Sequence, residues 1–198
     1  MKYRNKKTTG GKCGMAEKRD STDPMIIVVS GAEGVGITTI METLKARHSD
    51  RYVILSGDLC DFFAVPEVLS ACRKKWIGIC ADISRQTNRA VVFYGDLTPD
   101  IFSGADEEYR KRLRYVSVVC DDDELVHRME EKYGEKAHEK IRNIDMTYTQ
   151  TALVRNHVYQ GKISYPGIMP ESIDTTGLDA EQSAGLVDRW IIRALAEN

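Results

Sequence analysis

The chain has 198 residues and a formal net charge of −2, and 42% of its residues are hydrophobic and 29% charged. This length corresponds to about one domain, and the composition excludes collagen-like, disulfide-scaffold and wholly disordered classes. Residues 1–23 carry a charge of +4, which leaves −6 for the rest of the chain. An acidic body argues against a nucleic-acid-binding domain built on a broad basic face.

The sequence shows no sign of membrane insertion or export. No apolar stretch reaches the roughly 18 residues of a membrane-spanning helix, and the basic N-terminus is not followed by the apolar segment of a secretory signal. The five cysteines are odd in number and contain no C-x-x-C pair, so neither a disulfide framework nor a zinc site is predicted. We therefore expect a cytoplasmic protein, and the sequence leaves its oligomeric state open.

The N-terminal residues 1–23 are polar, lack apolar periodicity and are followed by Pro24. They are expected to form a flexible basic arm that precedes a domain of residues 24–198. The arm is interpreted either as a disordered leader or as an electrostatic contact with an acidic partner or with phosphates.

From Met25 onward, short β-branched and aromatic runs alternate with segments of helical periodicity. The expected strands are residues 25–29, 52–55, 90–94, 115–120 and 172–175. The expected helices are residues 38–48, 65–88, 106–114, 123–132, 135–159 and 179–196. Such alternation implies right-handed βαβ crossovers and therefore an α/β fold with helices on both faces of a parallel sheet.

The segment after the first strand has the spacing of a phosphate-binding loop, G-x-x-x-x-G-K-[ST]. It reads Gly31-Ala32-Glu33-Gly34-Val35-Gly36-Ile37-Thr38-Thr39. Its glycines permit a tight wrap that points backbone N–H groups inward at a helix N-terminus, and such a nest binds phosphate oxygens without any side chain. Thr38 occupies the position whose hydroxyl reaches Mg²⁺, so the sequence predicts a site for a nucleoside triphosphate and this ion.

The loop departs from the motif at Ile37, which stands where the lysine belongs. That lysine supplies a cation to the β- and γ-phosphates, and removing one preorganised donor of this kind costs roughly 10²- to 10³-fold in rate. Lys45 is not expected to replace it, because seven residues of helix place it about 10 Å from Thr38. The helix after the fourth strand offers better candidates. The alternative interpretation is a glycine-rich turn that binds nothing.

With this loop in an α/β pattern, residues 25–197 resemble the P-loop small-molecule kinases, particularly the nucleoside and nucleoside-monophosphate kinase group that includes adenylate kinase. The resemblance implies a P-loop NTPase fold with five parallel strands in the order 2-3-1-4-5 and a small helical lid at about residues 123–160. It also implies ATP and Mg²⁺ as cofactors and a small-molecule acceptor.

Two aspartates match acidic positions of this family. Asp58, in the segment Ile54–Leu59, resembles the acidic residue that serves magnesium-bound water or the acceptor. Asp96, in the turn Tyr94–Pro99, resembles the acidic residue beside the phosphate loop, which binds magnesium through water or acts as a base. No arginine follows the proline as it does in the nucleotide-kinase form D-G-F-P-R, which puts a monophosphate acceptor in doubt. Either aspartate is alternatively a turn or cap residue.

Two basic residues match the lid helix of the family, where a pair spaced by four residues clamps the phosphates. Arg128 and Lys132 share one helix face at this spacing, and Arg128 is the candidate to compensate for Ile37. The alternative is a solvated helix face on which Arg128 pairs with Glu124. Thr175 and Thr176 resemble the turn near the nucleotide base, and helix capping is their alternative role.

The predicted function is an ATP-dependent phosphotransferase of the nucleoside or nucleotide kinase type. In this hypothesis Gly31 to Thr39 cradle the donor, Asp58 or Asp96 orients the acceptor, and Arg128 stabilises the transferred charge. A second hypothesis is a nucleotide-binding module without turnover, in which Ile37 marks the loss of catalysis. A nucleic-acid-linked ATPase is disfavoured because no adequate basic surface is predicted.

Overall fold

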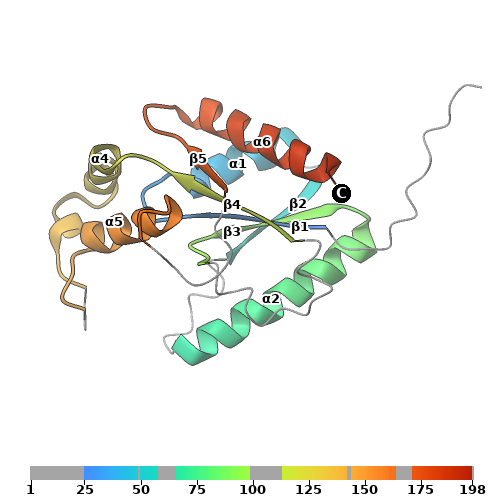
Figure 1. The fold of residues 1–198 in the computed structure, drawn as a ribbon, viewed down its shortest axis with the longest axis horizontal. Helices are drawn as coiled ribbons and strands as arrows, with labels where there is room; N and C mark the ends of the chain where they lie inside the picture. The colour runs from blue at the N-terminus through green and yellow to red at the C-terminus, as the bar shows by residue number, and fades with distance from the viewer. Residues whose placement is uncertain are drawn as a thin grey trace, which may run out of the picture.

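The computed structural model describes residues 25–48, 50–57, 66–98, 113–141, 144–163 and 171–197, and within α2 it describes side chains only from Lys75 onward. The expected arm, Asp58 and most of the expected helix 106–114 lie outside these residues. In the described part, one twisted sheet is covered by helices on both faces (Figure 1).

Five parallel strands form the sheet in the order β2-β3-β1-β4-β5, as the resemblance implied. The strands are β1 (Ile26–Gly31), β2 (Tyr52–Ser56), β3 (Ala90–Gly95), β4 (Leu113–Val119) and β5 (Glu171–Asp174). The central strand β1 is buried along its whole length, which explains its unbroken apolar run, because a parallel strand between two helical layers meets apolar neighbours on both faces.

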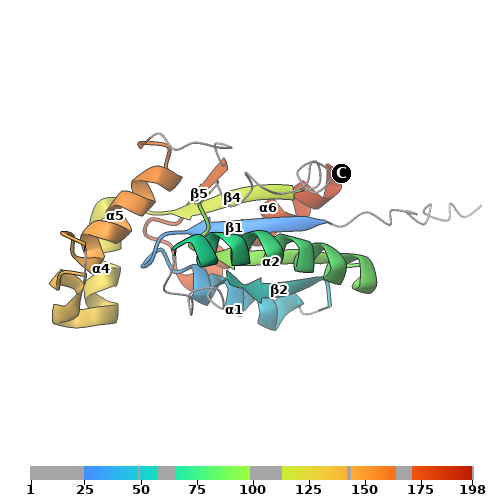
Figure 2. The same cartoon turned by 90° about the horizontal axis from the view of Figure 1, so that it is seen from below.

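The helices divide into three groups around the sheet. They are α1 (Ile37–His48), α2 (Pro66–Thr87), α4 (Asp122–Tyr133), α5 (Tyr148–Tyr159) and α6 (Ala180–Ala196). Helices α1 and α6 cover one face of the sheet and α2 covers the other, while α4 and α5 lie beyond the carboxyl ends of the strands (Figures 1 and 2). The phosphate loop between β1 and α1 opens at that same end, so the fold brings α4 and α5 to the loop.

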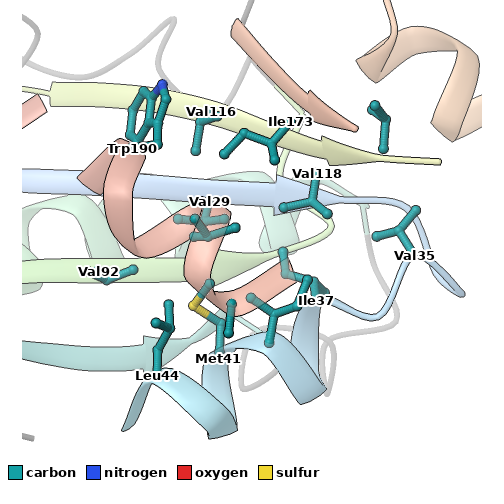
Figure 3. Close-up of a cluster of buried hydrophobic side chains, with 14 of the residues drawn as sticks. Val29, Val35, Ile37, Met41, Leu44, Val92, Val116, Val118, Ile173 and Trp190 are labelled. Carbon is teal, nitrogen blue, oxygen red and sulfur yellow. The ribbon is translucent and has the colours of Figure 1, made fainter. Parts of the chain in front are cut away.

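Alternate residues of β1 point into two separate apolar clusters. Ile27 and Val29 face α1 and α6, where they join a cluster that includes Met41, Leu44 and Trp190 (Figure 3). Each fully buried side chain of this size contributes roughly 1.5–3 kcal/mol to stability. The apolar faces of α1 and α6 therefore pack into the larger of the two clusters.

The expected continuous helix over residues 135–159 is wrong. The chain instead forms a 3₁₀ helix η3 (Gly134–His138), an isolated antiparallel bridge between Lys140 and Thr147, and then α5. Gly134, with φ of +57°, ends α4, and Thr147 starts α5 through a reciprocal capping box with Gln150. The expected helix 106–114 is also wrong at its end, because β4 already begins at Leu113.

Candidate functional site

The loop between β1 and α1 forms the tight wrap that its spacing predicts. Gly34 and Gly36 have φ values of +88° and +90°, a conformation that side chains with a Cβ rarely adopt. The Val35 N–H donates to the Ala32 carbonyl at 3.3 Å and closes the wrap. Because α1 begins at Ile37, the N–H groups of its first turn have no partner within the helix and are available to an anion.

Helix α4 packs directly against the outside of this loop. A Cβ at Gly34 would lie 2.8 Å from Leu125 Cδ1 and 2.9 Å from Met129 Sδ, so these two side chains would have to shift to admit it. At Gly36 the nearest atom to such a Cβ is Nη1 of Arg128, at 3.9 Å. The shape of the loop is therefore coupled to the position of α4.

A cavity of about 580 Å³ lies over the loop, within the usual size range of ligand pockets. Three elements contribute to it: the loop with the start of α1, the end of β3, and the end of α4. Its lining residues are Gly31, Ala32, Glu33, Gly34, Gly36, Ile37, Thr38, Thr39, Gly95, Asp96 and Lys132. The structure thus brings Asp96 and Lys132, two of the predicted site residues, to the predicted loop.

Ile37, at the position of the missing lysine, is part of the hydrophobic core. It is only 8% exposed and joins the cluster under the sheet, where Figure 3 shows it with Met41 on α1. One edge of its side chain still borders the cavity. The next two residues, Thr38 and Thr39, are exposed and line the cavity, so Thr38 can offer its hydroxyl to a ligand.

Lys132 is the only cationic side chain among the described residues that line this cavity. Its Nζ lies 3.2 Å from Oε1 of Glu33 in the loop, and the Tyr133 hydroxyl donates to the same carboxylate oxygen. Burial lowers the pKa of Lys132, but its hydrogen bonds with Tyr133 and Glu33 outweigh this effect, so the net shift is upward. The cavity therefore contains a charged ammonium group supplied by a neighbouring helix.

Arg128, one turn earlier on α4, has a different role from Lys132. Its guanidinium donates to the Glu124 carboxylate at 2.8 Å, to the Val35 carbonyl at 3.0 Å and to the Thr175 carbonyl at 3.2 Å. The predicted pair therefore separates: Lys132 lines the cavity over the loop, and Arg128 ties the loop to α4 and to the end of β5. The pairing with Glu124 that we considered as the alternative is present.

Arg128 also lines a second cavity of about 410 Å³. This cavity is formed by the loop, α4 and the start of α6. Its lining residues are Val35, Gly36, Thr39, Ile40, Glu124, His127, Arg128, Glu131, Leu178, Ala180 and Ser183. Gly36 and Thr39 line both cavities, so the two adjoin at the start of α1.

Asp96 lies at the carboxyl end of β3 and is held from α5. The Tyr159 hydroxyl donates to Asp96 Oδ1, and Arg155 Nε lies 3.6 Å from Oδ2. The sequence analysis missed both partners, because the contact between Tyr159 and Asp96 spans 63 residues and follows no local spacing. The sequence placed Tyr159 at the end of the expected helix 135–159 but gave no sign of its contact with Asp96.

Thr175 and Thr176 are occupied by contacts with the backbone and with Asp174. The Thr175 hydroxyl donates to the Val119 carbonyl at 3.0 Å, and Thr176 Oγ1 donates to Asp174 while accepting the Asp121 N–H at 2.8 Å. Leu178, further along this turn, is the residue that reaches the second cavity.

Within the described residues, no helix combines the length and hydropathy that a membrane span requires. The same residues contain no cluster of three or more histidine, cysteine or acidic side chains that could hold a metal ion by itself.

Neither protein-family models nor curated proteins match this chain, whereas solved structures do. A sugar kinase from Janibacter sp. HTCC2649 superposes with a TM-score of 0.53 and 12% identity, over 85% of this chain and 94% of that chain. The shikimate kinase of Acinetobacter baumannii gives 0.51 and 11%, over 86% and 94%. An uncharacterized protein from Eubacterium ventriosum gives 0.50 and 15%, over 85% and 98%.

The strand order, the loop and these superpositions together define the fold of the chain. The chain has the fold of the P-loop small-molecule kinases, and the resemblance expected from the sequence is confirmed at the level of the fold. At identities of 11% and 12%, the similarity concerns the fold and leaves the reaction to be argued from the site.

Proposed function

We propose that this protein is an ATP-dependent phosphotransferase of the nucleoside or nucleotide kinase type that works in the cytoplasm. The observation that carries the proposal is the cavity in which the phosphate loop, the Asp96 carboxylate and the Lys132 ammonium meet. Phosphoryl transfer depends mainly on positioning and on stabilising charge, and these three groups are the means to do both.

The loop and the start of α1 bind the phosphates of the donor through backbone N–H groups. The exposed hydroxyl of Thr38 and the carboxylate of Asp96 line the same cavity, and hydroxyl and carboxylate oxygens suit Mg²⁺ together with phosphate oxygens and water. When bound, this ion neutralises charge on the β- and γ-phosphates.

Lys132 takes over the part of the loop lysine in this proposal. Ile37 packs into the core and has no charge to offer, while the Lys132 ammonium reaches the cavity from α4. Once a phosphate replaces Glu33 as its partner, Lys132 is placed to stabilise the charge on the transferred group. Arg128, in contrast, keeps the loop in shape through the Val35 carbonyl.

The second cavity receives the nucleobase. It adjoins the phosphate cavity at Gly36 and Thr39, so a ligand with its phosphates in the first cavity can extend into the second. The planar guanidinium of Arg128 lines it, and such a group stacks well on an aromatic ring.

The acceptor lies on the Asp96 side of the loop. Its hydroxyl oxygen attacks the γ-phosphorus, the bond from this phosphorus to the β–γ bridging oxygen breaks, and ADP leaves. Asp96 is placed to accept the hydroxyl proton or to act through the metal, and Asp58 remains a further candidate for orienting the acceptor. The folds shared with a sugar kinase and a shikimate kinase support a small-molecule acceptor.

The first test is calorimetric titration with ATP and Mg²⁺ of the wild type and of Gly36→Arg. The wild type should bind, and the arginine should abolish binding because it fills the wrap at a glycine with φ of +90°. Gly78→Arg is the matched control, since a Cβ there meets nothing within 4 Å on α2. A wild type that fails to bind at millimolar ATP would refute the proposal, and binding would justify screening nucleosides and nucleotides for phosphoryl transfer.

A nucleotide-binding module without turnover is the second candidate, favoured by the packing of Ile37 into the core. Ile37→Lys separates the two candidates. In both cases the variant should bind ATP more tightly, but only a functional kinase should gain turnover with unchanged acceptor preference. An Ile37→Lys variant that binds ATP and transfers phosphate to no nucleoside or nucleotide would favour the binding module.

A further inference from the structure

The Tyr159 side chain is among the most deeply buried in the described chain, at 1% exposure, yet it ends in a polar hydroxyl. A buried hydroxyl is costly unless it forms a hydrogen bond. Here it donates to Asp96, a carboxylate that lines the phosphate cavity. Burial raises the pKa of Tyr159 and the nearby Asp96 charge raises it further, so the phenol keeps its proton and remains a donor.

The turn that carries Asp96 is fixed by two further hydroxyl groups. Ser30 Oγ, on β1, donates to the Gly95 carbonyl at 3.0 Å and accepts a hydrogen bond from the Leu97 N–H at 2.9 Å. The Tyr115 hydroxyl, on β4, donates to the Leu97 carbonyl at 2.7 Å. These two groups hold the backbone on either side of Asp96, and Tyr159 holds its carboxylate.

Helix α5, which carries Tyr159, is hydrogen-bonded to the end of β4. The side-chain amides of Asn156 and Gln160, on either side of it, both donate to the Cys120 carbonyl, at 2.6 and 2.7 Å. This carbonyl lies at the end of β4, which pairs with β1. The hydroxyl of Tyr159 therefore approaches Asp96 from a helix anchored to the sheet itself.

We infer that Tyr159 is a positioning residue that aims the Asp96 carboxylate at the metal–phosphate site. Asp96 lies on a turn after β3, where a short side chain on its own samples several orientations. The hydrogen bond from Tyr159 selects one of them. It also couples the carboxylate to α5, which packs against α4, the helix that carries Lys132.

This inference rests on the proposed function, and its test uses Mg²⁺-dependent binding of ATP. Tyr159→Phe keeps the ring and removes the hydroxyl, so the Mg²⁺ concentration for half-maximal ATP binding should rise about tenfold, as expected for a lost hydrogen bond to a charged group. Tyr52→Phe is the matched control: it also removes a buried hydroxyl that donates to a carboxylate, but this carboxylate, Asp188 on α6, does not line the phosphate cavity. This control should change the Mg²⁺ concentration for half-maximal ATP binding by less than about twofold. Circular dichroism checks that both variants fold.

A double-mutant cycle tests whether Tyr159 acts through Asp96. Asp96→Ala removes the acceptor of the Tyr159 hydroxyl and should raise the Mg²⁺ concentration for half-maximal ATP binding. Adding Tyr159→Phe to it should change this concentration no further. Additive effects, or equal effects of the two phenylalanine variants, would overturn the inference while leaving nucleotide binding intact. A wild type that binds no ATP with Mg²⁺ would instead overturn the proposed function, and the positioning role with it.

Discussion

The ammonium group of Lys132, on α4, lies 3.2 Å from the carboxylate of Glu33, which belongs to the loop between β1 and α1. The cation of the cavity is therefore paired with an anion of the loop. Both side chains are about half exposed, at 56% and 43%. A pair this exposed contributes only about 0–1 kcal/mol, so an arriving phosphate can displace Glu33 from Lys132 at little cost. If the cavity binds phosphates as proposed, Glu33 competes with them for Lys132.

Removing the Glu33 charge should therefore strengthen nucleotide binding. Glu33→Gln should tighten the binding of ATP with Mg²⁺ about threefold to fivefold, because the phosphates no longer compete with a carboxylate. Glu130→Gln, which makes the same charge change at an exposed position on α4 paired with His138, should have little effect. Calorimetry on both variants decides, and a Glu33→Gln protein that binds more weakly than Glu130→Gln would contradict the competition.

Lys132 should be important for phosphate binding and less so for stability. Lys132→Ala should weaken ATP binding by about tenfold or more, since a hydrogen bond to a charged group is worth about 1.5–3 kcal/mol. Its free energy of unfolding should change by less than about 0.5 kcal/mol, as for other exposed positions. Lys136→Ala, on the exposed side of η3, is the control for binding. If Lys132→Ala and Lys136→Ala bound ATP with equal affinity, Lys132 would not contribute to phosphate binding.

Arg128 should show the opposite pattern to Lys132. Its side chain is 19% exposed, and its guanidinium donates to Glu124 on α4, to the loop at Val35 and to the end of β5 at Thr175. Arg128→Ala should lower the free energy of unfolding by about 2–4 kcal/mol, because it leaves the Val35 and Thr175 carbonyls without this donor. Urea unfolding of Arg128→Ala beside Lys132→Ala measures the difference. If Arg128→Ala were as stable as Lys132→Ala, the bracing role of Arg128 would be wrong.

Much of the fold was predictable because local patterns encode it. The apolar run of β1, the glycines of the loop and the alternation of strands and helices each carry a signal within a few residues, and all three predicted features are present. The break between η3 and α5 was also encoded, in the capping box that Thr147 and Gln150 form at the start of α5. Helical periodicity on both sides concealed it.

The arrangement of the site was less predictable, because it depends on contacts between distant segments. The i, i+4 spacing placed Arg128 and Lys132 on one helix face, but nothing local distinguished the residue that braces the loop from the one that lines the cavity. That distinction arises from the Val35 and Thr175 carbonyls, 93 and 47 residues away from Arg128. Tyr159 and Asp96, 63 residues apart, meet in the same way.

Alkaline pH should destabilise the protein through Tyr52. Its hydroxyl donates to Asp188 of α6, and burial first, then the hydrogen bond and the charge of Asp188, raise its pKa above the ordinary 10.0. The unfolded chain releases this proton near pH 10 and the folded chain at higher pH, so the stabilisation is complete below pH 10 and is lost as the pH rises above it.

Tyr52→Phe removes this source of pH dependence. Between pH 9 and pH 11 the wild type should lose about 1 kcal/mol more of its free energy of unfolding than the variant does, because one pH unit above the unfolded-state pKa corresponds to about 1.4 kcal/mol for one proton. Asp188→Asn should give an intermediate result, since it removes the charge and leaves the burial. Urea titrations at both pH values measure the three proteins, and equal losses in the wild type and Tyr52→Phe would show that Tyr52 keeps its ordinary pKa in the folded state.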